Sequence, residues 1–172
     1  QTALEANFEQ VDFVRKYGNK IYFGDASRLD LLHAAGADKA RIFVLAIDDV
    51  EASLKTAQMV KAHYPHLKIY ARARNRMHAY QLMDLGVTVL MRETFLSSLE
   101  LARDVLVGLG QTAAAADEVA RRFRVHDEQL LDKQRAVRHD EEQLIASTRQ
   151  ARDELERLFE QDRAAVKPED NV

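Results

Sequence analysis

The stretch that decides the fold is Lys20-Ile21-Tyr22-Phe23-Gly24-Asp25-Ala26-Ser27-Arg28-Leu29-Asp30-Leu31-Leu32. Its first four residues include β-branched and aromatic side chains, which predict a strand. Gly24 predicts a tight turn, and the apolar residues that recur after Ser27 predict a helix. A strand, a turn and a helix in this order form the repeating unit of an α/β domain with a parallel sheet.

The same alternation continues along the chain. Strands are predicted at residues 20–23, 41–47, 68–73 and 87–91, with amphipathic helices between them. The run at 41–47 is apolar almost throughout, which is typical of a central strand covered on both faces. Core-facing helices are indicated by apolar stripes at three- and four-residue spacing, among them Leu4, Phe8, Val11 and Val14 before the first strand and Phe95, Leu99, Ala102, Leu106 and Leu109 after the last.

The predicted order begins on a helix, whereas a doubly wound nucleotide-binding fold begins with a strand and a Gly-rich turn. No G-x-G-x-x-G motif occurs in the sequence. We therefore predict, for residues 1–110, an α/β domain with an incomplete Rossmann-like doubly wound parallel sheet, whose first strand and Gly-rich turn are missing from this chain. Because the chain also begins without Met, we expect it to be a piece of a longer protein.

The composition changes after Gly110. No Gly or Pro occurs between Gln111 and Val166, which predicts one long helix or two helices. Apolar residues recur there every seven positions from Ala116 to Leu158, but the positions four further on are mostly polar, which makes only half of a coiled-coil seam. We expect a helical dimerisation and tail region at 111–166 and a frayed C-terminus at 167–172.

Several function classes are disfavoured by composition. The net charge of −3 and the even mixture of acidic and basic residues argue against nucleic acid as a partner. The longest apolar run, Ile42–Ile47, is far shorter than the about 20 residues that cross a bilayer. Cysteine is absent and the six histidines lack metal-ligand spacing, so we expect neither a metal site nor an enzyme.

Polar residues follow three of the predicted strands, at the edge where open α/β sheets bind ligands. Gly24, Asp25, Ala26 and Ser27 place backbone N–H groups and a carboxylate at a helix N-terminus, suited to a nucleotide. The alternative is ordinary capping, with Ser27 and Asp30 opening one helix and Asp48 and Glu51 the next. Arg72 and Arg74 point to the same side of a strand and suit phosphate or carboxylate, and surface ion pairs are the alternative.

Longer motifs carry a resemblance to a known family. Residues 13–32 and 34–37, together with Tyr64-Pro65-His66-Leu67, Ala71-Arg72-Ala73-Arg74 and Arg92-Glu93-Thr94-Phe95, resemble the Kef glutathione-gated potassium efflux proteins over residues 1–131. The resemblance implies a cytoplasmic regulatory module of the potassium-conductance-regulator and TrkA-N type, at the cytoplasmic face of the bacterial inner membrane. It follows a cation/proton antiporter domain in the same parent chain.

The resemblance also implies ligands and partners. The family module forms a homodimer, binds an adenine nucleotide, AMP or NAD(H), and senses glutathione, which holds the transporter closed, and glutathione adducts, which open it. A flavodoxin-like oxidoreductase assists as an ancillary subunit.

Transferred to this sequence, the resemblance places Arg92 on the glutathione carboxylate, Tyr17 near the sulfur substituent, and Asp127 in the glutathione site on the dimerisation helix. The adenine nucleotide would use Asp25 and Ala26, with the backbone of Ala46, Ile47 and Asp48. Two other hypotheses are an NAD-dependent oxidoreductase fragment, which would need a complete Gly-rich turn, and a purely structural dimerisation module.

Overall fold

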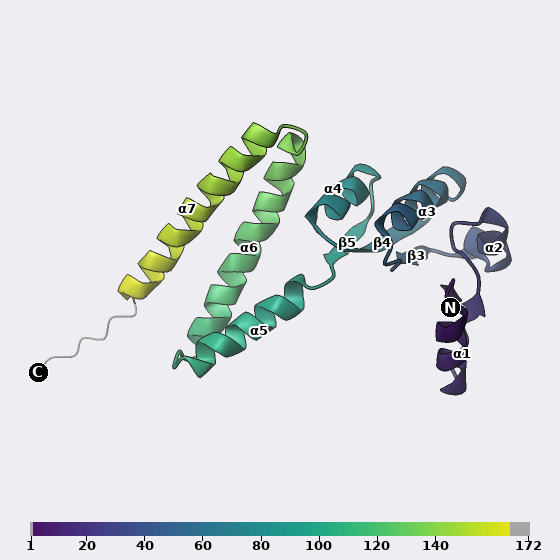
Figure 1. Cartoon of the computed structure of the whole chain (residues 1–172), viewed down its shortest axis with the longest axis horizontal. Coiled ribbons are helices and arrows are strands. Elements are labelled where there is room, and N and C mark those ends of the chain that lie inside the picture. Colours follow the sequence, from purple (N-terminus) through teal and green to yellow (C-terminus); the bar gives the residue numbers. More distant parts are fainter. Residues whose placement is uncertain (1, 166–172) are drawn as a thin grey trace, which may run out of the picture. The chain divides into compact units, whose positions relative to one another are not determined.

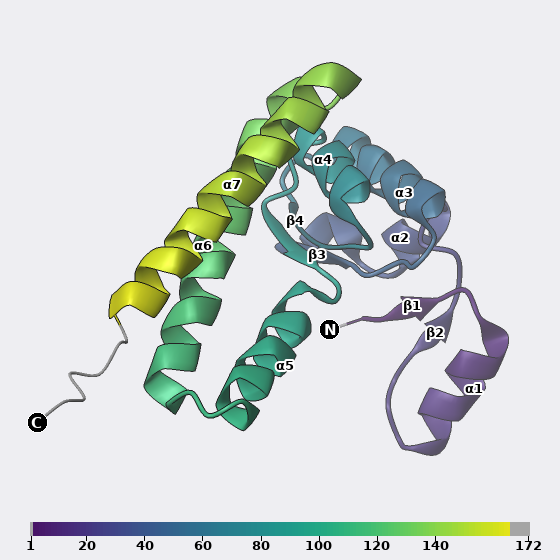
Figure 2. The same cartoon turned by 60° about the vertical axis from the view of Figure 1, so that its left-hand side comes forward.

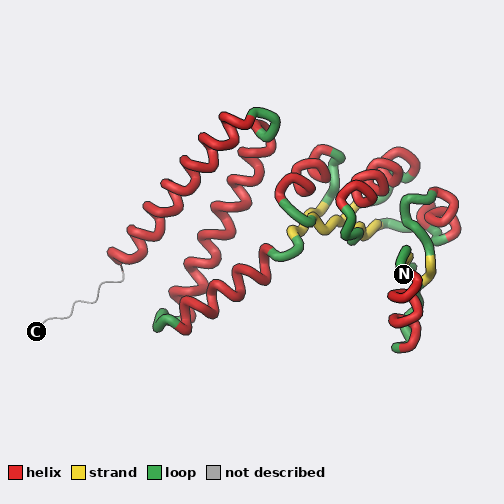
Figure 3. The backbone as a smooth tube through the Cα atoms, in the orientation of Figure 1, coloured by secondary structure: helices red, strands yellow, loops and turns green. Residues whose placement is uncertain are grey.

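The computed structural model describes residues 2–165 and divides them into two compact units, one ending at Glu93 and one beginning at Thr94 (Figure 1). The first unit combines helices and strands, and the described part of the second contains helices (Figure 3). The boundary proposed from sequence after residue 110 falls at the turn between the helices α5 (Phe95–Gly108) and α6 (Ala113–Val137).

The first unit follows the predicted strand and helix alternation, with one addition at its start. Its elements are β1 (Leu4–Glu5), α1 (Phe8–Lys16), β2 (Tyr22–Phe23), α2 (Leu29–Ala34), the short 3-10 helix η1 (Ala37–Lys39), β3 (Ile42–Leu45), α3 (Val50–His63), β4 (Lys68–Ala73), α4 (Arg76–Asp84) and β5 (Val89–Arg92).

The prediction that the unit begins on a helix is wrong, because Leu4 lies in β1 and not in α1. The side chain of Asn7 accepts the N–H of Gln10 and thereby starts α1 after Leu4. The residues before it are then free to pair in parallel with β2, and Gly24 donates its N–H to the carbonyl of Glu5 at 2.9 Å.

The strands form a two-stranded sheet, β1-β2, and a three-stranded sheet, β3-β4-β5, and every pairing is parallel. The predicted central strand, β3, is an edge of its sheet, and the exposed fractions of Ile42 and Val44 are 49% and 70%. A doubly wound sheet with strand order 3-2-1-4-5-6 would have one more strand between β1 and β3. The described residues therefore form the predicted incomplete sheet.

One face of the three-stranded sheet carries the core. The helices α3 and α4 lie together on this face in both views (Figures 1 and 2). Alternate residues of β4, namely Ile69, Ala71 and Ala73, are buried beneath them. On the opposite face Val44, Val89 and Met91 are exposed, although parallel sheets are normally covered on both faces.

The start of two helices differs from the prediction. In α3 the N-cap is Asp49, which accepts the N–H of Ala52 at 2.8 Å, and not Asp48. In α2 it is Arg28, without a capping side chain, because Ser27 bonds to Asp25 instead. Gly18 follows the C-cap of α1 with a φ of 81°, in the left-handed region that favours glycine.

In the second unit α6 and α7 (Glu141–Ala165) form an antiparallel hairpin, so of the two alternatives for residues 111–166 the structure has two helices and not one (Figures 1 and 2). Two of the polar positions that interrupt the coiled-coil seam, Asp127 and Gln134, are buried there. Gln134 donates from Nε2 to the hydroxyl of Thr148 on α7 at 3.1 Å, so the hairpin has a partly polar interior. The predicted frayed end at 167–172 lies outside the described residues.

The apolar stripe of α5 was predicted to face a core, and the single chain covers it only in part. No residue of α5 is fully buried, Phe95, Leu99 and Leu106 of the stripe are half-buried, and Leu109 after the helix is 78% exposed. Among the described residues α5 packs against α6, while Leu101 and Val105 on another side of the helix remain 68% and 52% exposed. None of the described helices is long and apolar enough to span a bilayer.

The neighbouring carboxylates Asp48 and Asp49 allow a test of the helix start. Asp49→Ala removes the acceptor of the Ala52 N–H, so we expect the free energy of unfolding to fall by about 1 kcal/mol, measured by urea denaturation followed by circular dichroism. The matched control is Asp48→Ala, whose carboxylate is 74% exposed and should change this free energy less. Equal losses would contradict the assignment of Asp49 as the cap.

Candidate functional site

The candidate site is built from residues that follow parallel strands. Ala46, Ile47 and Asp48 come after β3, Arg74 after β4 and Glu93 after β5. Because the three strands are parallel and in register, these residues meet at one edge of the sheet. This carboxyl edge is where open α/β sheets bind ligands.

Arg72 connects all three strand ends. Its Nη2 donates to the carbonyl of Ala46 at 2.9 Å and to the carboxylate of Asp48, and its Nη1 donates to Glu93 Oε1 at 2.9 Å. The planar guanidinium presents several N–H groups at fixed angles, so one side chain can hold partners on two neighbouring strands. Arg72 therefore fixes the geometry of the edge.

Glu93 also accepts from Arg74, whose Nη1 lies 3.4 Å from Oε2. Each carboxylate oxygen of Glu93 thus faces one of the two arginines that were predicted to bind an anion. The carboxylate is about three-quarters shielded from solvent, with a side-chain exposed fraction of 26%. The geometry accommodates a carboxylate, and here the carboxylate is the protein's own, as the ion-pair alternative expected.

The loop after β2 has a separate set of contacts. Asp25 accepts the backbone N–H of Ser27 and its hydroxyl, both at 2.8 Å, and these two bonds lower the pKa of the Asp25 carboxyl. The ammonium of Lys55 on α3 lowers it further, which places this loop near the helix that follows β3. Ala26 is half-buried in the same turn.

Gly24 is closely packed in this loop. A Cβ at this position would lie 2.9 Å from the Cδ1 of Leu31. A larger residue here would therefore require the Leu31 side chain to move. The turn leaves Asp25 exposed at the end of β2.

The residues expected to bind glutathione lie on separate elements. Tyr17 ends α1 with an exposed fraction of 72%, and its ring centroid is 5.1 Å from that of Phe13. Arg92 is the last residue of β5 and is half-buried. Asp127 lies on α6 in the second unit, and its side chain is buried. The sequence did not predict this burial, because the residues around Asp127 are mostly polar.

Two further carboxylates belong to the edges and were missed as site residues by sequence reasoning. Glu5 is the last residue of β1, and its carboxylate accepts the N–H of Asn7 at 2.8 Å. An acidic residue at this strand end is typical of ribose recognition in doubly wound folds, and it would have been found had β1 been recognised. Glu93 follows β5 and forms ion pairs with Arg72 and Arg74. These residues are far apart in the sequence, so no local pattern indicates the pairing.

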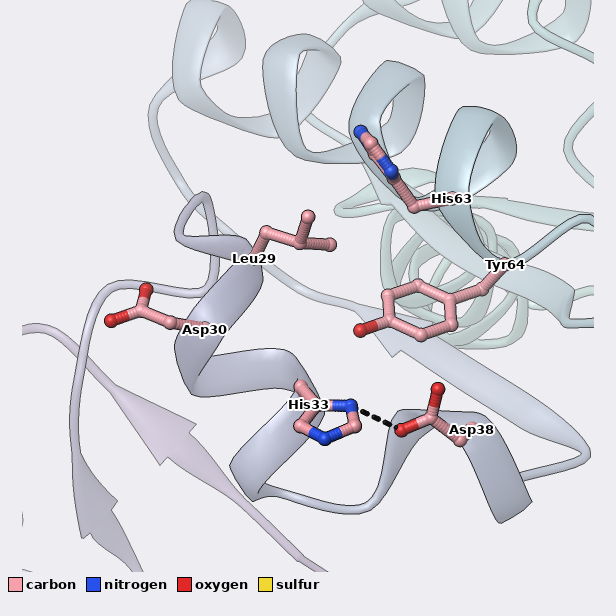
Figure 4. A pocket seen from close by; sticks show the side chains of 6 residues that line it. All are labelled: Leu29, Asp30, His33, Asp38, His63 and Tyr64. Carbon is pink, nitrogen blue, oxygen red and sulfur yellow. Dashed lines mark ion pairs between the residues drawn. The ribbon is translucent and has the colours of Figure 1, made fainter.

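A hollow lies elsewhere in the first unit (Figure 4). It has a volume of about 610 Å³ and is lined by Leu29, Asp30, His33, Asp38, His63 and Tyr64. His33 Nδ1 and Asp38 Oδ2 are 2.6 Å apart, and burial, with a smaller effect of Asp38, raises the pKa of Tyr64. Within residues 2–165 no cluster of three metal-ligating side chains occurs.

Together these contacts describe an edge whose groups can bind a ligand. Its side chains are carboxylates and arginines engaged with one another, and Ala46 beside them is an exposed residue. Such groups recognise hydroxyls, amides and anions. The hollow of Figure 4 includes none of the residues predicted to contact the nucleotide.

Comparison with known proteins gives matches over both units. Residues 1–93 match the TrkA-N domain family, and residues 97–171 match the family described as the potassium efflux system KefB C-terminal domain. A solved structure of the Kef C-terminal domain of Shewanella denitrificans in AMP-bound form is 40% identical, with a TM-score of 0.71, and the match covers 79% of this chain and 83% of that one.

A second solved structure supports the fold alone. It is the TrkA-N domain of the inner membrane protein ybaL from Escherichia coli, 20% identical over 64% of this chain and 78% of that chain, with a TM-score of 0.50.

Proposed function

We propose that this chain binds an adenine nucleotide at the carboxyl edges of its sheets. The premise is that the chain belongs to the Kef potassium efflux C-terminal domain family and has a TrkA-N domain as its first part. The family is one of regulatory domains, and we propose that this chain acts in regulation and not as an enzyme. The observation that carries the proposal is the 40% identity to a Kef domain solved with AMP, joined to the strand-end geometry of Asp25, Asp48 and Arg72.

The nucleotide would contact both sheets. Glu5 and Asp25 end neighbouring strands, and their carboxylates would accept hydrogen bonds from ribose or adenine. Ala26 and the backbone of Ala46 to Asp48 would line the adenosine. Ser27 lies at the turn into α2. The phosphate would pair with Arg72 and Arg74 and would replace the carboxylate of Glu93 as their partner.

Glutathione would be the regulatory ligand. Arg92 would pair with a glutathione carboxylate, Tyr17 would lie near the sulfur substituent, and Asp127 would complete the site from the dimerisation helix. Glutathione and its adducts would gate in opposite directions because each favours a different arrangement of the dimer. The gated function would be potassium efflux by the antiporter domain of the parent chain, at the cytoplasmic face of the inner membrane and with a flavodoxin-like oxidoreductase as ancillary subunit.

The exposed apolar surface of α5 supports a homodimer. Leu101 and Val105 on this helix and Leu109 at its C-cap are exposed in the single chain. Single exposed apolar residues are common, but a helix of 14 residues without a buried one is unusual in a folded domain. A second copy related by a two-fold axis would bury these residues.

The nucleotide proposal is tested by Asp25→Ala. Losing an acceptor for the nucleoside should weaken AMP binding about tenfold in calorimetric titration of this chain. The matched control, Asp30→Ala, removes the neighbouring carboxylate that pairs with Arg28 and should leave AMP affinity unchanged. If both variants lose only stability and neither loses affinity, Asp25 belongs to the turn and not to the site.

For glutathione, the informative change is Arg92→Ala. Removal of a charged donor should cost about 2 kcal/mol of binding free energy, followed by fluorescence titration. Arg41→Ala provides the control, since Arg41 precedes β3 at the opposite edge of the sheet. An unchanged affinity for glutathione would remove Arg92 from the ligand site.

The dimer is tested by Leu101→Asp. A charge at the interface of two α5 helices should dissociate the dimer, so sedimentation at micromolar concentration should give a dimer for the wild type and a monomer for the variant. Met77→Asp, an exposed apolar position in the first unit, should remain dimeric. A monomeric wild type with intact helicity would contradict the proposal.

A further inference from the structure

A buried histidine lies directly beside the strand end that carries Arg72 and Arg74. His78 is the third residue of α4, and its exposed fraction is 0%. The helix begins after the N-cap Asn75, whose Oδ1 accepts the N–H of His78 at 2.9 Å. The imidazole is therefore enclosed in the turn between β4 and α4.

The imidazole accepts a backbone hydrogen bond at this turn. The ladder between β4 and β5 ends where Ala73 pairs with Arg92 and the N–H of Glu93 donates to the carbonyl of Ala73. Arg74 lies one residue beyond the ladder, and its N–H donates to Nδ1 of His78 at 3.2 Å. Only an unprotonated ring nitrogen accepts, so the neutral ring carries its hydrogen on Nε2.

Burying the imidazole of His78 costs folding free energy, and the space that the ring fills does not explain why a histidine is used here. Nε2 of His78 is buried and is without a hydrogen-bond partner in the described structure, and burial lowers the pKa of the ring. A buried polar atom left unpaired is unfavourable, and an apolar side chain of similar size would avoid it. What the imidazole adds is the acceptor for the Arg74 N–H.

This bond bears directly on the arginines of the edge. The backbone N–H of Arg74 donates to His78, and the side chain of the same residue contacts Glu93. Arg72 lies two residues earlier, within β4, and also contacts Glu93. A shift of the strand end would move both guanidinium groups relative to Ala46 and Asp48. Small displacements of a positioned charge have large effects on binding.

We propose that His78 is a positioning residue of the nucleotide site, whose Nδ1 holds the end of β4 so that Arg72 and Arg74 are aligned at the carboxyl edge. The proposal rests on the proposed function, because the edge is taken as the nucleotide site. His78 does not touch the ligand and acts through the Arg74 backbone.

Two substitutions of His78 separate its acceptor from its volume. Asn places a carbonyl oxygen on Cγ, where the ring has Nδ1, and can accept the Arg74 N–H, whereas Phe fills the space without an acceptor. In AMP titrations of the full chain, we expect His78→Asn to bind within about twofold of the wild type and His78→Phe about tenfold more weakly. Leu82→Ala, a buried change on the same helix, should lower stability but not AMP affinity.

Amide hydrogen exchange gives a second readout that needs no nucleotide. The Arg74 N–H should be protected in the wild type and in His78→Asn, and it should exchange faster in His78→Phe. If the wild type does not bind AMP, the proposed function fails, and this exchange still decides whether His78 holds the strand end. Equal exchange of Arg74 in all three proteins would overturn the positioning role, as would equal AMP affinity of Phe and wild type.

If His78→Phe does not fold, the wild type alone decides through the nitrogen chemical shifts of its imidazole. The proposal expects an Nδ1 without a hydrogen and an Nε2 that bears one. The opposite tautomer would overturn it, because Nδ1 could not accept the Arg74 N–H.

Discussion

At the carboxyl edge of a parallel sheet the ends of neighbouring strands lie side by side. In this chain the guanidinium of Arg72, on β4, forms hydrogen bonds to the residues that follow β3 and β5. It joins the backbone of Ala46 and the carboxylate of Asp48 after β3 to the carboxylate of Glu93 after β5. Ion pairs between exposed side chains contribute little, but this network is partly shielded and one group serves several partners. The proposed nucleotide site uses the same residues, so its ligand would have to rearrange the contacts that organise the edge.

In the proposed function, Glu93 would link this rearrangement along the chain to the second unit. It is the last residue of the first unit, and Thr94 after it is the N-cap of α5. An anion that took the place of the Glu93 carboxylate on Arg72 and Arg74 would release the segment that leads into α5. A regulatory domain needs an element with two arrangements that ligands favour unequally, and a segment whose ion pairs a ligand could replace would have that property.

The sequence predicted what depends on local periodicity and missed what depends on single distant contacts. β4 was predicted with its observed bounds, because Lys68–Ala73 alternates and turns flank it. β1 was missed because a two-residue strand that precedes an Asn-capped helix continues the apolar spacing of that helix. Asp49 and Asp48 are neighbours of the same type, and only the backbone angle decides which one caps α3. The pairing of Glu93 with Arg72 and Arg74 and the burial of Asp127 arise from tertiary packing, for which no sequence spacing exists.

The central claim is that an adenine nucleotide binds at the carboxyl edges, and backbone amide chemical shifts of the full chain during titration with AMP test it most directly. The account predicts saturable shifts at Gly24 to Ser27 and at Ala46 to Asp48, with smaller ones at Arg74 and Glu93. Shifts confined to His33, His63 and Tyr64 would place the nucleotide in the hollow between α2 and α3 instead. That result, or the absence of any saturable shift, would contradict the account.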